Sequence, residues 1–232
     1  MNLLFIQAQD VATQAAEAAA QGKEELTLGF WDLALQGGWI MYPLAFLSIV
    51  AIYIFFERYF AIRSANSIDN NFMNMIRDYI KEGRMDSAMT LCQKTDSPVS
   101  RMIAKGISRI GRPLNDVHAA IENVGNMEVT KLEKGLNVLA SVAGGAPMIG
   151  FLGTVIGMIQ AFYDMSMAGN NIDISNLSGG IYTAMVTTVG GLIVGIIAYF
   201  AYNILVSKVE KVVFKMESNT TDFMDLLNEP AK

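Results

Sequence analysis

The chain has few of the side chains that most often build catalytic and metal sites. Its 232 residues include one histidine, His118, and one cysteine, Cys92. A single cysteine excludes an intramolecular disulfide, and a single histidine excludes a metal site built on several imidazoles. No P-loop, G-x-S-x-G or H-E-x-x-H pattern occurs. We therefore expect no enzyme, no catalytic residue, no metal site and no cofactor, and we interpret His118 as a helix-surface residue.

Charge is missing from three long blocks of the chain. Residues 40–56, 135–163 and 175–207 contain no Asp, Glu, Lys or Arg. The hydrocarbon core of a bilayer is about 30 Å thick and needs roughly 20 apolar residues of helix. The second and third blocks exceed that length. The first is near the lower limit, and Trp39 and Tyr59 flank it as interfacial anchors. The sequence therefore predicts three transmembrane helices.

The positions of Lys and Arg predict the orientation of these spans. Of the 17 Lys and Arg residues, twelve lie between the first and second blocks, and none lies between the second and third. Lys23 alone precedes the first block, and the remainder follow the third. Positive loops stay in the cytoplasm, so we expect the N-terminus outside, and the middle segment and the C-terminus inside. The sequence has no basic stripe with interleaved aromatic residues, so we expect no nucleic-acid partner.

Helical patterns fill the segments outside the membrane. Apolar residues follow helical spacing from Phe72, the sequence "KEGR" predicts a break at Gly83, and Pro98 suits the first position of a later helix. We expect one continuous helix from Leu114 to Tyr163, which carries the second span into the cytoplasm. The sequence "SKVEKVVFKMES" extends the third span in the same way. The predicted fold is an all-α membrane protein whose long helices extend into a cytoplasmic helical bundle.

These patterns divide the chain into seven segments. The N-terminal segment contains "AQDVATQAAEAAAQGKEEL", which reads as a polar helix, with a flexible tail as the alternative. In chain order we predict periplasmic polar or amphipathic helices at 1–37, the first span at 38–60, a cytoplasmic helical domain at 61–134, the second span at 135–163, a short periplasmic loop at 164–176, the third span at 177–206, and a cytoplasmic helix and tail at 207–232.

Small residues and hydroxyls gather on one face of the second and third spans. Small residues let membrane helices approach closely, so helix packing alone accounts for the glycines. The hydroxyls also suit a narrow polar pathway. The spans hold no ionisable group, so a proton pathway would need one from another chain. A non-conducting scaffold and a self-sufficient channel remain alternatives. The predicted packing positions are Ala146, Gly150, Gly153, Gly157, Gly180, Gly190, Gly191 and Gly195, and the hydroxyls are Thr154, Thr183, Thr187 and Thr188.

Three segments carry a family resemblance. "GGWIMYPLAFLSIVAIYIFFER", "GAPMIGFLGTVIGMIQAF" and "GGIYTAMVTTVGGLIVGIIAYFAYN" resemble the spans of the ExbB/TolQ/MotA proton-channel family, and most of all its ExbB branch. The similarity extends from Trp31 to Lys215. The resemblance implies a pentamer in the bacterial inner membrane around a central pore, which holds two copies of a single-span ExbD-like partner. That partner's membrane Asp would carry the proton, and the proton motive force would energise a TonB-like protein and outer-membrane uptake.

The resemblance also assigns roles to particular residues. Thr154 and Thr188 would be pore threonines that face the partner's Asp, and Asn203 would be a polar group near the cytoplasmic exit. Thr183, in "GIYTAM", stands where the family commonly has a Glu in "GIAEAL". Hydroxyl and carbonyl oxygens are hard ligands that also suit a cation, so a sodium-driven motor remains an alternative. So do a TolQ-like role in the cell envelope and roles in secretion or gliding.

Overall fold

The computed structural model describes residues 37–66, 71–167 and 174–228. The predicted N-terminal helices, residues 168–173 of the loop at 164–176, and the last residues of the tail lie outside this part. Its elements are η1 (Gly38–Ile40), α3 (Met41–Ala65), α4 (Phe72–Lys81), α5 (Met85–Lys94), α6 (Pro98–Ile107), α7 (Leu114–Glu133), α8 (Leu136–Met167) and α9 (Ile174–Asn228).

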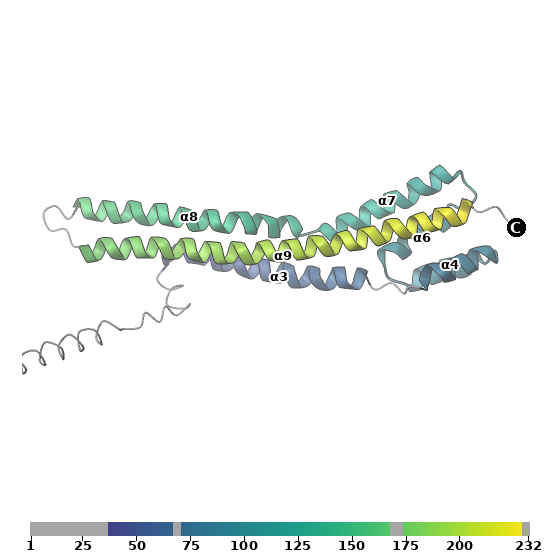
Figure 1. The fold of residues 1–232 in the computed structure, drawn as a ribbon, viewed down its shortest axis with the longest axis horizontal. Helices are drawn as coiled ribbons and strands as arrows, with labels where there is room; N and C mark the ends of the chain where they lie inside the picture. The colour runs from purple at the N-terminus through teal and green to yellow at the C-terminus, as the bar shows by residue number, and fades with distance from the viewer. Residues whose placement is uncertain (1–36, 67–70, 168–173, 229–232) are drawn as a thin grey trace, which may run out of the picture.

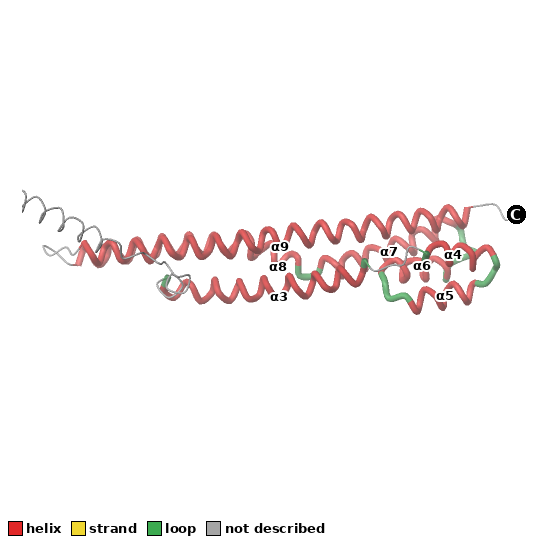
Figure 2. Tube along the Cα trace, turned by 60° about the horizontal axis from the view of Figure 1, so that its bottom comes forward, coloured by secondary structure: helices red, strands yellow, loops and turns green. Residues whose placement is uncertain are grey.

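The described helices form a long molecule with two halves (Figure 1). In the membrane half, α8 and α3 pack along the first part of α9; in the bundle half, α4 to α7 gather around its last part (Figures 1 and 2). Helix α9 has 55 residues, about 80 Å at 1.5 Å per residue, and runs through both halves. This confirms that the third span extends beyond the membrane as one helix.

The membrane half has the surface of a protein that lies in lipid. Helices α3, α8 and α9 each contain a stretch long and apolar enough to cross a bilayer. Large apolar side chains on all three point outward, including Phe46, Phe151 and Phe200, which are 66%, 65% and 62% exposed. Such a surface is unfavourable in water and is favourable in hydrocarbon. The all-helical prediction with three membrane-competent helices is confirmed, whereas the N-out orientation and the central pore stay predictions.

The second span does not continue unbroken from α7. Helix α7 ends at Glu133, Lys134 leaves the helical conformation, and Gly135 has a φ of +84°. The prediction of one continuous helix from Leu114 to Tyr163 is therefore wrong at this junction. Glycine populates positive φ without the steric strain that a Cβ brings, so Gly135 allows the chain to change direction. Arg58 of α3 donates from Nη1 to the Lys131 carbonyl at 3.3 Å and so satisfies part of the exposed end of α7.

Two helix boundaries predicted in the bundle half, at Gly83 and at Pro98, are confirmed. Helix α4 ends before Gly83, which has a φ of +73°. Helix α6 begins at Pro98, and the preceding Ser97 side chain accepts a hydrogen bond from the Ser100 backbone N–H at 3.1 Å. Proline at the first helical position loses no hydrogen bond, because that N–H has no partner inside the helix.

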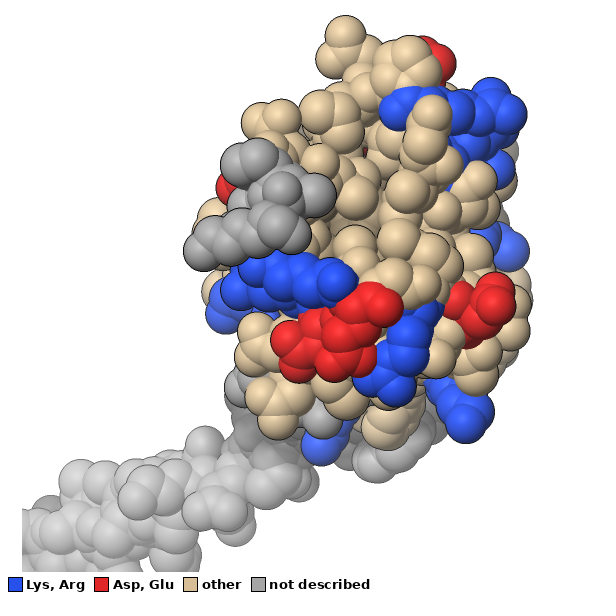
Figure 3. All heavy atoms as spheres, turned by 90° about the vertical axis from the view of Figure 1, so that its right-hand side faces the viewer, with Lys and Arg blue, Asp and Glu red and all other residues tan. Residues whose placement is uncertain are grey.

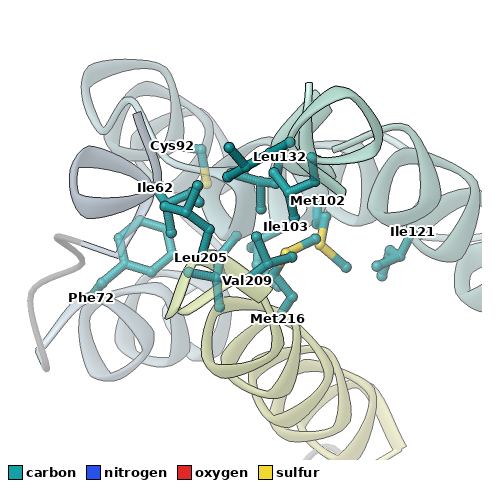
Figure 4. Close-up of a cluster of buried hydrophobic side chains, with 14 of the residues drawn as sticks. Ile62, Phe72, Cys92, Met102, Ile103, Ile121, Leu132, Leu205, Val209 and Met216 are labelled. Atoms are coloured by element: carbon teal, nitrogen blue, oxygen red, sulfur yellow. The ribbon is translucent and has the colours of Figure 1, made fainter. Parts of the chain in front are cut away.

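Apolar side chains from six helices, α3 to α7 and α9, meet in the core of the bundle half (Figure 4). The same buried cluster contains Phe72 of α4, Cys92 of α5, Ile103 of α6, Ile121 of α7 and Val209 of α9. Burial raises the pKa of the Cys92 thiol to about 11, because the interior disfavours the thiolate. The single cysteine therefore acts as an apolar packing residue.

One buried carboxylate links α6 to α7. Glu128 is 4% exposed, and its two oxygens accept hydrogen bonds from Arg101 Nη2 and Lys131 Nζ, each at 2.7 Å. Burial works to raise the pKa of Glu128, but the hydrogen bonds and positive charges of Arg101 and Lys131 outweigh it and hold the pKa below its ordinary value. Arg101 also pairs with Asp96. Figure 3 shows how Lys, Arg, Asp and Glu otherwise spread over the outer end of the bundle half.

We expect Arg101→Gln to destabilise the full chain by about 1 kcal/mol, or roughly 2–4 °C in Tm at neutral pH. The figure is modest because the Arg101 side chain is 42% exposed and solvent screens the pair. The folded pKa of Glu128 is lowered, so the stabilisation is present above the unfolded carboxyl pKa of about 4.3 and is lost as pH falls through the folded pKa.

Thermal unfolding of purified wild type and Arg101→Gln, from neutral pH to below about pH 4.3, measures this loss of stability. The gap between wild type and Arg101→Gln is expected to close as the pH falls below 4.3. Arg112→Gln is the matched control, since it removes a cation from an exposed position between α6 and α7 and is expected to leave Tm unchanged. A gap that stays constant with pH would contradict the role of the Glu128 charge.

Candidate functional site

The candidate site is the seam between α8 and α9, where the two backbones nearly touch. A Cβ added to Gly150 would lie 2.8 Å from the Thr187 carbonyl oxygen and 3.0 Å from the Gly191 Cα. A Cβ added to Gly191 would lie 2.6 Å from the Ala146 carbonyl oxygen and 2.8 Å from the Gly150 Cα. The obstructing atoms belong to backbone and cannot rotate away. Only glycine permits this approach, which is the packing that lipid-embedded helices use.

Further small residues continue the seam in the direction of the α8–α9 loop. A Cβ added to Gly157 would lie 2.7 Å from the Ala184 Cβ, and one on Gly180 would lie 2.9 Å from the Ala161 Cβ. One on Gly153 would overlap the Thr187 hydroxyl. The sequence prediction missed Ala161, although it lies at helical spacing from the predicted seam residue Gly157. The seam is thus a continuous row of small side chains on both helices.

Pro147 lies inside α8 at the other end of the seam. Its ring packs against Gly195, whose added Cβ would lie 2.5 Å from the Pro147 Cγ and 3.1 Å from the Ala143 carbonyl oxygen. Proline has no N–H to donate to the carbonyl four residues earlier, which is that of Ala143. Gly195 therefore lies against both the proline ring and the carbonyl that the proline leaves without its helical donor. This local fit explains why a proline is tolerated here.

Two of the predicted hydroxyls lie in the seam. Thr187 is buried, and its Oγ1 donates to the Ala184 carbonyl at 2.6 Å, with the Gly150 carbonyl oxygen at 3.3 Å. Thr188 is half-buried, and its Oγ1 donates to the Gly150 carbonyl at 3.1 Å. The Gly150 carbonyl of α8 therefore lies within hydrogen-bonding distance of two hydroxyls from α9. In an apolar surrounding, these bonds fix the register of the two helices.

The other predicted polar residues lie apart from this pair. Thr154 is half-buried on α8, and its hydroxyl donates to the Phe151 carbonyl at 2.6 Å. Thr183 is half-buried on α9, one turn before Thr187. Asn203 is exposed and donates to the Tyr199 carbonyl at 2.8 Å, about 22 Å along the helix from Thr188. The Thr154 hydroxyl and the Asn203 amide each donate within their own helix, so the oxygens of these side chains remain available as acceptors.

Gly190 faces a different neighbour from the other predicted packing residues. A Cβ there would lie 3.1 Å from Met41 Cε of α3. Within one chain, Gly190 therefore serves the contact of α9 with α3, and its predicted place in a pore stays a prediction.

The seam contains no charged side chain. The uncharged stretches of the sequence at 135–163 and 175–207 include every seam residue named above. Within residues 37–66, 71–167 and 174–228, no group of three or more His, Cys, Asp or Glu residues is placed to hold a metal ion. The chemistry available at the seam is therefore that of hydroxyl and carbonyl oxygens in a low-dielectric setting.

Comparison with known proteins agrees with the resemblance. The model of the MotA/TolQ/ExbB proton channel family matches residues 94–218, which is more than half of the chain and includes the whole seam. A putative biopolymer transport protein ExbB homolog of Methanothermobacter thermautotrophicus is 28% identical over 187 residues, covering 80% of this chain and 66% of that protein.

Two proteins named biopolymer transport protein ExbB match shorter parts. The one from Xanthomonas campestris is 33% identical over 109 residues, covering 47% of this chain and 43% of that protein. The one from Helicobacter pylori is 39% identical over 77 residues, covering 33% of this chain and 52% of that protein. The chain thus spans between about two fifths and two thirds of these relatives. With three membrane-competent helices, a glycine seam and this match, the chain belongs to the MotA/TolQ/ExbB proton channel family.

Proposed function

We propose that this chain is the inner-membrane channel subunit of an ExbB–ExbD-type motor that couples the proton motive force to TonB-dependent outer-membrane transport. Its own α8–α9 seam would form part of the wall of a central pore in a pentamer. Two copies of a single-span partner would occupy that pore and would supply the membrane Asp that carries the proton. The relatives named biopolymer transport protein ExbB support this branch of the family.

The observation that carries the proposal is a polar seam without an ionisable group. Thr187, Thr188 and the Gly150 carbonyl place several oxygens together in an uncharged part of two spans. Proton routes in membranes normally contain Asp, Glu, His or Lys. A proton channel subunit that lacks such a residue in its spans needs one from a partner. If these hydroxyls only fixed the register of the two helices, their removal would leave ion flux unchanged.

The same oxygens support a second candidate. Hydroxyl and carbonyl oxygens coordinate hard cations, and Thr183 is uncharged at the position where the family commonly has a Glu. A sodium-driven motor of the same architecture, or a TolQ-like motor of the cell envelope, would use the seam in the same way. Substitution of Na⁺ by K⁺ in the transport assay separates a sodium-driven motor from a proton-driven one.

Reconstitution in liposomes tests the proposal. We expect no proton flux from the chain alone and measurable flux from the chain co-expressed with a single-span ExbD-like protein that has an Asp in its span. Asp→Asn in the span of that partner is expected to abolish the flux and to leave the complex assembled, which size-exclusion chromatography checks. Flux from the chain alone would identify a self-sufficient channel, and undiminished flux in the Asp→Asn complex would refute the motor proposal.

A further inference from the structure

A second feature of the membrane half lies outside the seam. Helices α3 and α9 leave a groove with a volume of about 450 Å³ between them, open on one side. Ser48 is the one polar residue in its lining. The groove residues lie in the uncharged stretches at 40–56 and 175–207, so hydrocarbon surrounds it in the membrane. The walls and floor include Ala51, Phe55, Val194, Ala198, Ala201 and Ile204.

Small residues make the groove, and large ones border it. On α9, Ala198 and Ala201 lie among Ile197, Phe200 and Ile204, so the surface of the helix is hollow between them. From Val194 to Ile204 the groove extends about 15 Å along the helix, which is about half the thickness of the hydrocarbon core. Its length therefore matches one leaflet.

The helix faces that line the groove become positively charged beyond one of its ends. Lys208 follows Ile204 by four residues and Lys211 follows it by seven, so both continue the same face of α9. On α3, Arg63 follows Phe56 by seven residues. By the same helical spacing, the acidic residues of these segments, Glu57 and Glu210, lie on other faces of their helices. A stripe of cations therefore begins where the apolar groove stops.

One of these cations is already held at the end of the groove. The Lys208 Nζ lies 4.7 Å from the centroid of the Tyr59 ring, and Tyr59 follows the groove residue Phe55 by four residues. The cation–π contact keeps the ammonium between α3 and α9. Aromatic and basic side chains at the end of a membrane span are where phospholipid headgroups lie.

We propose that the α3–α9 groove binds one acyl chain of an anionic phospholipid, with the phosphate held by Lys208 and supported by Arg63 and Lys211. The groove supplies apolar area one leaflet long, and the basic stripe supplies the complementary charge. Two-fold pairing of copies through this face is unfavourable, because it would bring the same cations together. The bound lipid would join α3 to α9 on the side away from the pore-forming seam.

Native mass spectrometry of the purified full chain tests the proposal, with phosphatidylglycerol and phosphatidylcholine of identical acyl chains as probes. We expect wild type to retain one phosphatidylglycerol per chain and to prefer it about fivefold over phosphatidylcholine. Lys208→Gln is expected to remove that preference and to leave phosphatidylcholine binding unchanged. Ala201→Phe fills the groove and is expected to lose both lipids.

Two matched variants control for charge and bulk. Lys94→Gln removes a cation from α5 in the bundle half, and Ala61→Phe adds a ring to an exposed position of α3 away from the groove; both are expected to bind as wild type does. Equal phosphatidylglycerol binding by wild type and Lys208→Gln would overturn the headgroup assignment. This comparison of wild type with Lys208→Gln tests the headgroup assignment even if the Ala201→Phe variant does not fold. Disulfide formation between two copies that each carry Ile204→Cys and Cys92→Ser would show that copies pair two-fold across the groove, and would overturn the lipid assignment.

Discussion

Gly191→Ala is expected to separate α8 from α9 and to abolish function. The added Cβ would lie 2.6 Å from the Ala146 carbonyl oxygen and 2.8 Å from the Gly150 Cα, both of which are backbone atoms. No rotamer change relieves the overlap, so the helices must move apart, and the Thr188 hydroxyl loses its 3.1 Å bond to the Gly150 carbonyl. Overpacking of this kind costs about 1–3 kcal/mol. Thermal unfolding in detergent measures stability, and proton flux through the complex reconstituted in liposomes measures function.

Gly144→Ala is the matched control for this prediction. Gly144 lies on the same helix as Gly150, but an added Cβ meets no atom within 4 Å. Alanine has a helix propensity about 1 kcal/mol better than glycine, so this variant is expected to be as stable as wild type or slightly more stable. Gly150→Ala is expected to behave as Gly191→Ala does, because the two glycines contact each other. Wild-type stability and function in Gly191→Ala would contradict the close backbone seam.

The fold was largely predictable because its signals are local. Uncharged blocks longer than the bilayer core identify the second and third spans without any knowledge of packing. Gly83 and Pro98 act within one turn of their own position, and both boundaries were predicted. Gly135 was missed because a lone glycine within an apolar pattern also fits a continuous helix. Lys134 before it is a typical residue for the C-terminal end of a helix. The Lys134–Gly135 pair was therefore the signal in the sequence that a helix ends here.

The seam was only partly predictable because contact partners are not local. Helical spacing brings Gly150, Gly153 and Gly157 to one face, but it does not say which helix that face meets. Gly190 is a small residue like those of the seam, and yet it contacts Met41 of α3. The neighbour that each glycine meets depends on how three helices pack. The spacing also gave no reason for Pro147, whose fit against Gly195 depends on a residue 48 positions later.

Thr154→Val together with Thr188→Val is expected to reduce ion flux through the assembled complex by about ten- to a hundredfold. Valine keeps the shape of threonine and removes its oxygen. A hydrogen bond to a charged group is worth about 1.5–3 kcal/mol, and its loss from a transport barrier corresponds to that factor in rate. The stability of the chain is expected to change much less, because the carbonyl acceptors at Gly150 and Phe151 keep their helical N–H donors. Proton flux in liposomes and Tm in detergent measure the two effects separately.

Thr130→Val and Thr188→Ser distinguish an oxygen in the pathway from an oxygen that only packs. Thr130 is exposed on α7, and its hydroxyl donates to the carbonyl of Asn126 in its own helix at 2.8 Å, so Thr130→Val removes a similar back-bonded hydroxyl outside the membrane half. It is expected to leave flux unchanged. Thr188→Ser keeps the oxygen and is expected to restore most of the flux lost in Thr188→Val. Normal flux in the double valine variant would assign both threonines to packing, because a pathway that needed their oxygens could not conduct without them.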